Sequence, residues 1–110
     1  MNEAEPVKVI RLTGELEIGR KNEIRSTLRA PADGTPVLLD LAGVTYADSI
    51  ALTELLRFCA EAQQVGQPVA LVIQTPQFAR LIQYAGLATV FKVFAEPAEA
   101  LAYLTESPRQ

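Results

Sequence analysis

The stretch VLLDLAGVTYADSIALTELL, Val37–Leu56, decides the fold of this chain. It starts with a nearly continuous apolar run, Val37–Leu41, which is typical of a strand covered on both faces. The residues Ala42–Ala47 are predicted to form a loop. Asp48 and Ser49 then open a helix, because Asp and Ser are among the residues preferred at a helix cap. The stretch therefore predicts a buried strand, a connecting loop and an amphipathic helix.

The predicted helix extends to about Val65 and is ended by Gly66. Its apolar residues recur at spacings of three and four, which places them on one face that would pack inward. These residues are Leu52, Leu55, Leu56, Cys59 and Ala62. The opposite, solvated face is predicted to carry Thr53, Arg57, Glu61 and Gln64.

Further strands and helices alternate on both sides of this stretch. Strands are predicted at Val7–Leu12, Val69–Ile73 and Phe91–Phe94. Helices are predicted at Arg20–Leu28, from Thr75-Pro76 to Gly86, and from Pro97 onward, with Thr75 as a side-chain cap and with Leu101 and Leu104 facing inward. The alternation favours a single small α/β domain. Its sheet would be mixed and mostly parallel, with four to five strands and about four helices.

The composition limits the classes of function. With 110 residues, 49% of them hydrophobic, the chain is expected to form one domain with a core at about residues 7–104. Its net charge of −3 gives no long-range attraction to nucleic acid or to an anionic membrane. No apolar run approaches the roughly 20 residues of a membrane span, and the acidic N-terminus lacks a signal core, so the cytoplasm is the expected compartment. One cysteine and no histidine exclude an internal disulfide and His-dependent triads, and neither a metal nor another cofactor is expected.

The Asp48-Ser49 pair has two compatible interpretations. The first is a helix cap. The second is that Ser49 is phosphorylated. A phosphate there would lie near free helix N–H groups and the positive end of the helix dipole, so the fold would tolerate it. The nearly two added negative charges would repel any partner on that surface.

Four stretches, in order along the chain, carry a resemblance to a known family. LTGELE (Leu12–Glu17) is similar to the exit of that family's first strand, and VLLDLAGVTYADS (Val37–Ser49) to its central strand and phosphorylation loop. GQPVALV (Gly66–Val72) and AGLATVFKVF (Ala85–Phe94) follow at the family's spacing. Together they resemble the STAS domain, specifically the stand-alone anti-anti-sigma factor type, over nearly the whole chain.

The resemblance implies a protein-binding module and no enzyme activity. It implies that Ser49 is phosphorylated by a serine kinase that is also an anti-sigma factor, and that a cognate phosphatase resets it. The unphosphorylated protein would bind this kinase and release its sigma factor or other client. The partner surface is expected at the loop, the exposed start of the next helix and the exit of the first strand. It comprises Tyr46, Asp48, Ser49, Ile50, Thr53, Glu54, Arg57, Glu15 and Glu17.

The phosphorylation loop also departs from the family's D-S-S/T-G-L-G form, because Ile50 and Ala51 follow Ser49. This variant resembles scaffold-type STAS proteins of stress-signalling complexes. The alternative function is therefore an unphosphorylated structural STAS subunit, in a lipid-transport ABC complex or a stressosome-like scaffold. The oligomeric state is left open between a monomer and a weak dimer.

Other candidate residues have simpler roles. Asp40 ends a buried strand, where a receiver domain carries its phosphorylated Asp, but the other acidic and Lys residues of a receiver are not at their expected places. We expect Asp40 to be hydrogen-bonded near the loop. Cys59 is predicted to be inert packing. A basic cluster near the first helix is predicted to be a solvated face, with docking of an acidic kinase surface as the alternative. Its residues are Arg20, Lys21, Arg25 and Arg29.

Overall fold

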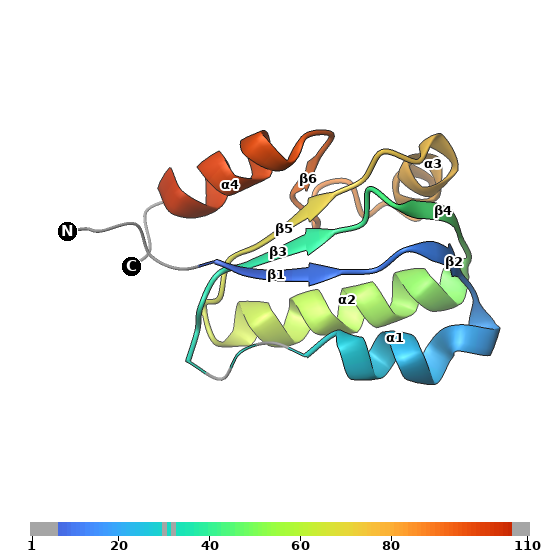
Figure 1. Cartoon of the computed structure of the whole chain (residues 1–110), viewed down its shortest axis with the longest axis horizontal. Helices are drawn as coiled ribbons and strands as arrows, with labels where there is room; N and C mark the ends of the chain where they lie inside the picture. Colours follow the sequence, from blue (N-terminus) through green and yellow to red (C-terminus); the bar gives the residue numbers. More distant parts are fainter. Residues whose placement is uncertain (1–6, 30, 32, 107–110) are drawn as a thin grey trace.

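A four-stranded parallel sheet runs through the centre of the domain (Figure 1). The structure, a computed structural model, describes residues 7–29, 31 and 33–106. The strand order is β1-β3-β5-β6, and neighbouring strands pair in parallel, as the alternation of strands and helices predicted. The strands are β1 (Lys8–Arg11), β3 (Val37–Asp40), β5 (Val69–Val72) and β6 (Val93–Phe94).

Helices cover both faces of this sheet (Figure 1). On one face lie α1 (Lys21–Thr27) and α2 (Ser49–Gln64), and on the other lies α4 (Pro97–Glu106). The fourth helix, α3 (Pro76–Tyr84), lies beyond the ends of β3 and β5. Side chains alternate along β3, so Leu39 enters the large core with α1 and α2, while Leu38 enters a smaller core with α4.

Most of the predicted loop Ala42–Ala47 is a strand, from Val44 to Ala47, and this part of the prediction was wrong. A separate two-stranded parallel sheet pairs β2 (Gly14–Leu16) with β4 (Val44–Ala47). It continues the β1–β3 pair after a break, where Gly14 N–H donates to Gly43 O at 3.0 Å. A Cβ on Gly43 would come within 2.9 Å of the Thr13 side chain, so glycine at position 43 allows the backbone segments around Thr13 and Gly43 to approach closely.

The packing of α2 differs from the predicted stripe at several positions. Leu52, Leu55 and Ala62 are buried as predicted, but Leu56 is 38% exposed. Phe58, which the prediction omitted, is buried. In α4, Leu104 is buried as predicted, whereas Leu101 is 41% exposed. The inward face of each helix is therefore rotated slightly from the one that the spacing indicated.

Glu54 is the largest departure, because it was expected on the exposed start of α2 and is only 3% exposed. Its carboxylate accepts hydrogen bonds from Arg25 Nε at 3.2 Å and Nη2 at 3.1 Å, and a further one from Arg57. The bonds from Arg25 are the main reason that the pKa of Glu54 lies below its ordinary value of 4.5; burial opposes this shift and the charge of Arg57 reinforces it. The buried Glu54 of α2 thus links this helix to Arg25 of α1. It is not available to a partner and does not belong to the predicted contact surface.

We expect Glu54→Gln to lower the free energy of unfolding at pH 7 by about 1–3 kcal/mol, because both arginines lose a charged partner. The folded pKa is lowered, so this stabilisation is complete above about pH 4.5 and is lost as the pH falls through the folded pKa. Urea unfolding should therefore show a gap between wild type and variant at pH 7 that narrows below pH 4.5.

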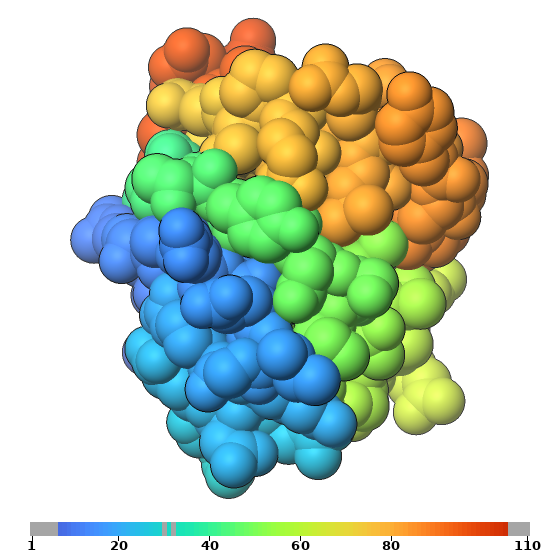
Figure 2. Space-filling view, turned by 90° about the vertical axis from the view of Figure 1, so that its right-hand side faces the viewer, coloured from blue at the N-terminus to red at the C-terminus, as the bar shows by residue number. Residues whose placement is uncertain are grey.

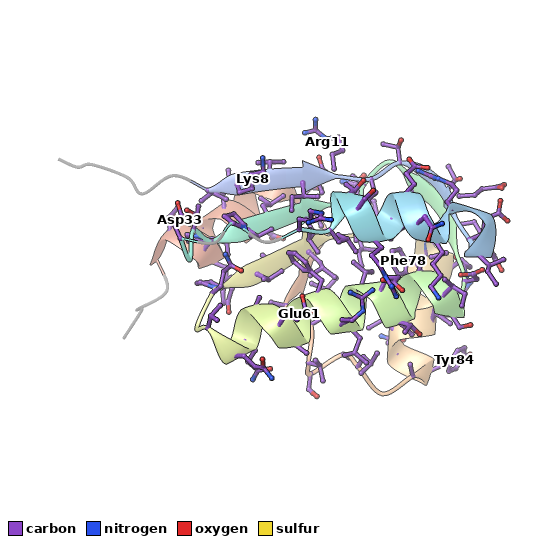
Figure 3. The ribbon with its side chains drawn as sticks, turned by 90° about the horizontal axis from the view of Figure 1, so that it is seen from below. Lys8, Arg11, Asp33, Glu61, Phe78 and Tyr84 are labelled. Atoms are coloured by element: carbon purple, nitrogen blue, oxygen red, sulfur yellow. The ribbon has the colours of Figure 1, made fainter. Side chains whose placement is uncertain are left out.

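Glu61→Gln is the matched control, since Glu61 is an exposed residue of the same helix (Figure 3). Its effect should stay within about 0.5 kcal/mol at either pH. Equal losses in the two variants would show that the contacts of Glu54 do not stabilise the fold.

Candidate functional site

The predicted site lies at the end of the domain where the small β2–β4 sheet meets the first turns of α2 and α3. Figure 2 shows this end, with the segment around β2 against β4 and both next to the helices. A 3₁₀ turn, η1 (Ile18–Arg20), follows β2 there. Three separate parts of the sequence therefore meet on one surface: β2 with η1, β4 with the start of α2, and the start of α3.

Asp48 holds this end together. Its Oδ1 accepts hydrogen bonds from the backbone N–H of Ile50 at 2.9 Å and of Ala51 at 3.2 Å, which confirms the predicted cap of α2. Its Oδ2 accepts a hydrogen bond from the N–H of Ile18 at 3.2 Å. Its own N–H donates to Leu16 O at 3.0 Å. One residue thus fixes the start of α2 against the segment after β2, thirty residues earlier.

Ser49 is exposed and is the first residue of α2. Its carbonyl oxygen accepts a hydrogen bond from Thr53 Oγ1 at 2.9 Å. The prediction that a phosphate here would lie near free helix N–H groups needs correction for two of these groups. The N–H groups of Ile50 and Ala51 are already bonded to Asp48. A phosphate on Ser49 would therefore lie beside a carboxylate that already occupies two N–H groups of the first turn.

The other residues of the predicted surface divide by exposure. Tyr46 is 45% exposed and pairs in register with Glu15 on the neighbouring strand, so both lie on one face of the small sheet. Glu17 is also exposed. On α2, Thr53 is exposed, Ile50 and Arg57 are half-buried, and Glu54 is buried. All except Glu54 therefore have some surface available to a partner.

Gln77 of α3 and Thr75, the residue before α3, were not predicted as part of the site, and they hold β4 in place. The side-chain amide of Gln77 accepts a hydrogen bond from Ala47 N–H at 3.0 Å and donates one to Ala47 O at 2.7 Å. Thr75 does not cap α3 with its side chain, as had been predicted; its hydroxyl donates to Val44 O instead. The pattern of the sequence gives no signal for these contacts, because they join segments thirty residues apart.

Two arginines of the basic cluster make specific contacts and are not simply solvated. Arg20 Nη1 donates to Thr13 O at 2.7 Å and to Glu15 O at 2.8 Å, while its other nitrogens bond Glu23. The hydrogen bond to Glu23 raises the pKa of Arg20. Arg25 bonds Glu54, as described above. Arg20 therefore holds the segment around β2, while Arg25 links α1 to α2.

The remaining candidates have structural roles. Asp40 accepts hydrogen bonds from Arg11 Nε at 2.9 Å and from Ala42 N–H at 3.1 Å, as the prediction of a hydrogen-bonded carboxylate required. Burial raises the pKa of the Cys59 thiol to about 12, which makes it a poor nucleophile. Within the described residues, no cluster of potential metal ligands occurs, and no helix is long and apolar enough to span a membrane.

We expect Gln77→Ala to lower the free energy of unfolding by about 1–3 kcal/mol, because it leaves the buried N–H and C=O of Ala47 without these partners. Gln83→Ala, at an exposed position of the same helix, is the control and should change stability by less than about 0.5 kcal/mol. Chemical denaturation of both variants tests this, and equal stabilities would contradict a structural role for the Gln77 amide.

Comparisons with known proteins agree with this fold. The family model of the STAS domain matches residues 1–100. No curated protein matches the sequence significantly. Among solved structures, an anti-sigma factor antagonist from Mycobacterium paratuberculosis superposes with a TM-score of 0.76 at 21% identity, over 94% of this chain and 89% of that one.

Two other solved structures are similar. A candidate anti-sigma factor antagonist from Thermotoga maritima has a TM-score of 0.76 and 20% identity, over 87% of this chain and 86% of that one. A sulfate transporter family protein from Wolinella succinogenes has a TM-score of 0.72 and 19% identity, over 93% and 88%. At these identities the superpositions show a common fold, while the family model covers most of the sequence. The chain therefore belongs to the STAS domain family.

Proposed function

We propose that this protein is an anti-sigma factor antagonist whose binding is switched by phosphorylation of Ser49. The observation that carries the proposal is the position of Ser49, an exposed residue that directly follows the Asp48 cap in the middle of the partly exposed surface described above. The names of two solved neighbours, both anti-sigma factor antagonists, support the same function.

The proposed partner is an anti-sigma factor that is also a serine kinase. In the reaction, the Ser49 hydroxyl oxygen attacks the γ-phosphorus of ATP held by the kinase, the bond to the ADP oxygen breaks, and the hydroxyl proton passes to a base of the kinase. A cognate phosphatase would hydrolyse the phosphoserine and restore the hydroxyl group. Both enzymes would act on the protein in the cytoplasm.

The switch would work through charge at a desolvated contact. Unphosphorylated Ser49 would lie inside the interface with Tyr46 and Thr53, and the bound kinase would release its sigma factor. Phosphorylation adds about −1.5 to −2 charges at neutral pH. The dianion would be adjacent to the Asp48 carboxylate, with Glu15 and Glu17 exposed on the neighbouring segment, so burying it against a partner would be costly.

The test is capture from a lysate of the native host with wild-type, Ser49→Ala and Ser49→Asp proteins as baits, followed by mass spectrometry. We expect an ATP-binding kinase to be held by wild type and Ser49→Ala. Its recovery on Ser49→Asp should fall by at least about tenfold, because like charges at an interface cost several kcal/mol. Ser26→Asp, at an exposed serine of α1, is the matched control and should bind like wild type.

The chemistry of the modification is tested separately by incubating the protein with the captured kinase and ATP. We expect a phosphoryl group that resists hydroxylamine and is absent from Ser49→Ala. A hydroxylamine-labile group would identify an acyl phosphate, which would point to Asp40 and contradict the proposal.

The second candidate is an unphosphorylated structural subunit of a transporter or scaffold. Two observations favour it: Ile50-Ala51 after Ser49, and the neighbour from a sulfate transporter family. If all three baits hold the same transporter or scaffold subunits, Ser49 acts as part of the helix cap and this candidate is correct.

A further inference from the structure

We propose that Asp48 couples the charge state of Ser49 to the position of Ile18, so that phosphorylation releases the segment Glu17–Gly19 from the start of α2. This inference rests on the proposed phosphorylation of Ser49. It adds a conformational response to the added charge.

The coupling follows from the two oxygens of one carboxylate. Oδ1 of Asp48 bonds the first N–H groups of α2, and Oδ2 bonds the N–H of Ile18 at 3.2 Å. A carboxylate is planar and rigid, so a rotation that frees Oδ1 also moves Oδ2. The cap of α2 and the tie to Ile18 therefore form or break together.

A phosphate on Ser49 would compete directly for the same donors. It brings three strong acceptor oxygens to the residue next to Asp48. The N–H groups of Ile50 and Ala51, which Asp48 now occupies, belong to the same first turn of α2, one and two residues after Ser49. Because phosphate and carboxylate repel each other, the phosphate would displace the Asp48 carboxylate from these donors, and the bond to Ile18 would be lost with it.

The release would be confined to a short segment. On one side, Leu16 pairs with Ala47 and accepts the hydrogen bond of Asp48 N–H at 3.0 Å. On the other side, Arg20 bonds the backbone before it at 2.7 and 2.8 Å. Between these anchors, Asp48 is the partner of the Ile18 N–H among the described residues.

The side chain that would move is exposed and apolar. Ile18 is 67% exposed, so little buried surface opposes its displacement. It lies beside Asp48, at the edge of the proposed partner surface. A partner that contacts Ile18 would therefore lose an apolar contact in the same event that introduces the repelling charge.

The experiment measures amide hydrogen exchange by NMR in ¹⁵N-labelled full-length protein carrying phosphoserine at position 49, introduced during translation. We expect the Ile18 amide to exchange about tenfold faster than in the unmodified protein, corresponding to one lost hydrogen bond. In the Asp48→Asn variant, without phosphate, the amide of Ile18 should also exchange about tenfold faster than in the wild type. The Asp48 amide, which bonds Leu16, should keep its protection and so report that the β2–β4 pairing is intact.

Phosphoserine at position 26 in α1 is the matched control and should leave the exchange rate of the Ile18 amide unchanged. Equal Ile18 exchange in the unmodified and Ser49-phosphorylated proteins would overturn the coupling even if a kinase acts on Ser49. If the Ile18 amide exchanges faster in the Ser49-phosphorylated protein but capture from the host lysate yields no kinase, the coupling is supported and the proposed function is contradicted.

Discussion

The carboxylate of Asp48 is the group on which the structure of the candidate site depends. A parallel sheet fixes where its strands end, but it does not determine how the segments beyond the strands meet. Here Asp48 accepts three backbone hydrogen bonds, two from α2 and one from Ile18. Each of these N–H groups would otherwise need another partner. The residue that caps α2 thus also fixes the start of η1 and the end of β2 through its hydrogen bonds to Ile18 and Leu16.

Most of the fold could be predicted because it is encoded locally. The apolar runs of β3 and β5, and the capped, periodic helix α2, carry their signals within a few residues. The pair β2–β4 could not be predicted in this way, since each strand is short and is stabilised by pairing with a distant segment. Phe58 lies at helical spacing from Leu55 and could have been found from the sequence. The burial of Glu54 could not, because it depends on how α1 packs across α2.

The candidate site shows the same division. Asp48, Ser49 and the exposed residues around them could be identified from cap chemistry and from the family resemblance. Gln77 and Thr75 could not, because a glutamine or threonine at a helix start has no preferred distant partner. The burial of Glu54 also narrows the part of α2 that a partner can reach. On α2, a partner could instead contact residues near the first turn, such as Thr53 and Ile50.

The side chain of Gln77 has a consequence for how copies of the protein meet. The outer side of β4 would otherwise present a free N–H and C=O at Ala47, which is the pattern that recruits a strand from another molecule. The Gln77 amide makes the same pair of hydrogen bonds that such a strand would make. The Gln77 side chain thus takes the hydrogen-bonding positions that a neighbouring strand would occupy at Ala47. The surface can stay open to a partner's side chains while its backbone is closed to edge-to-edge aggregation.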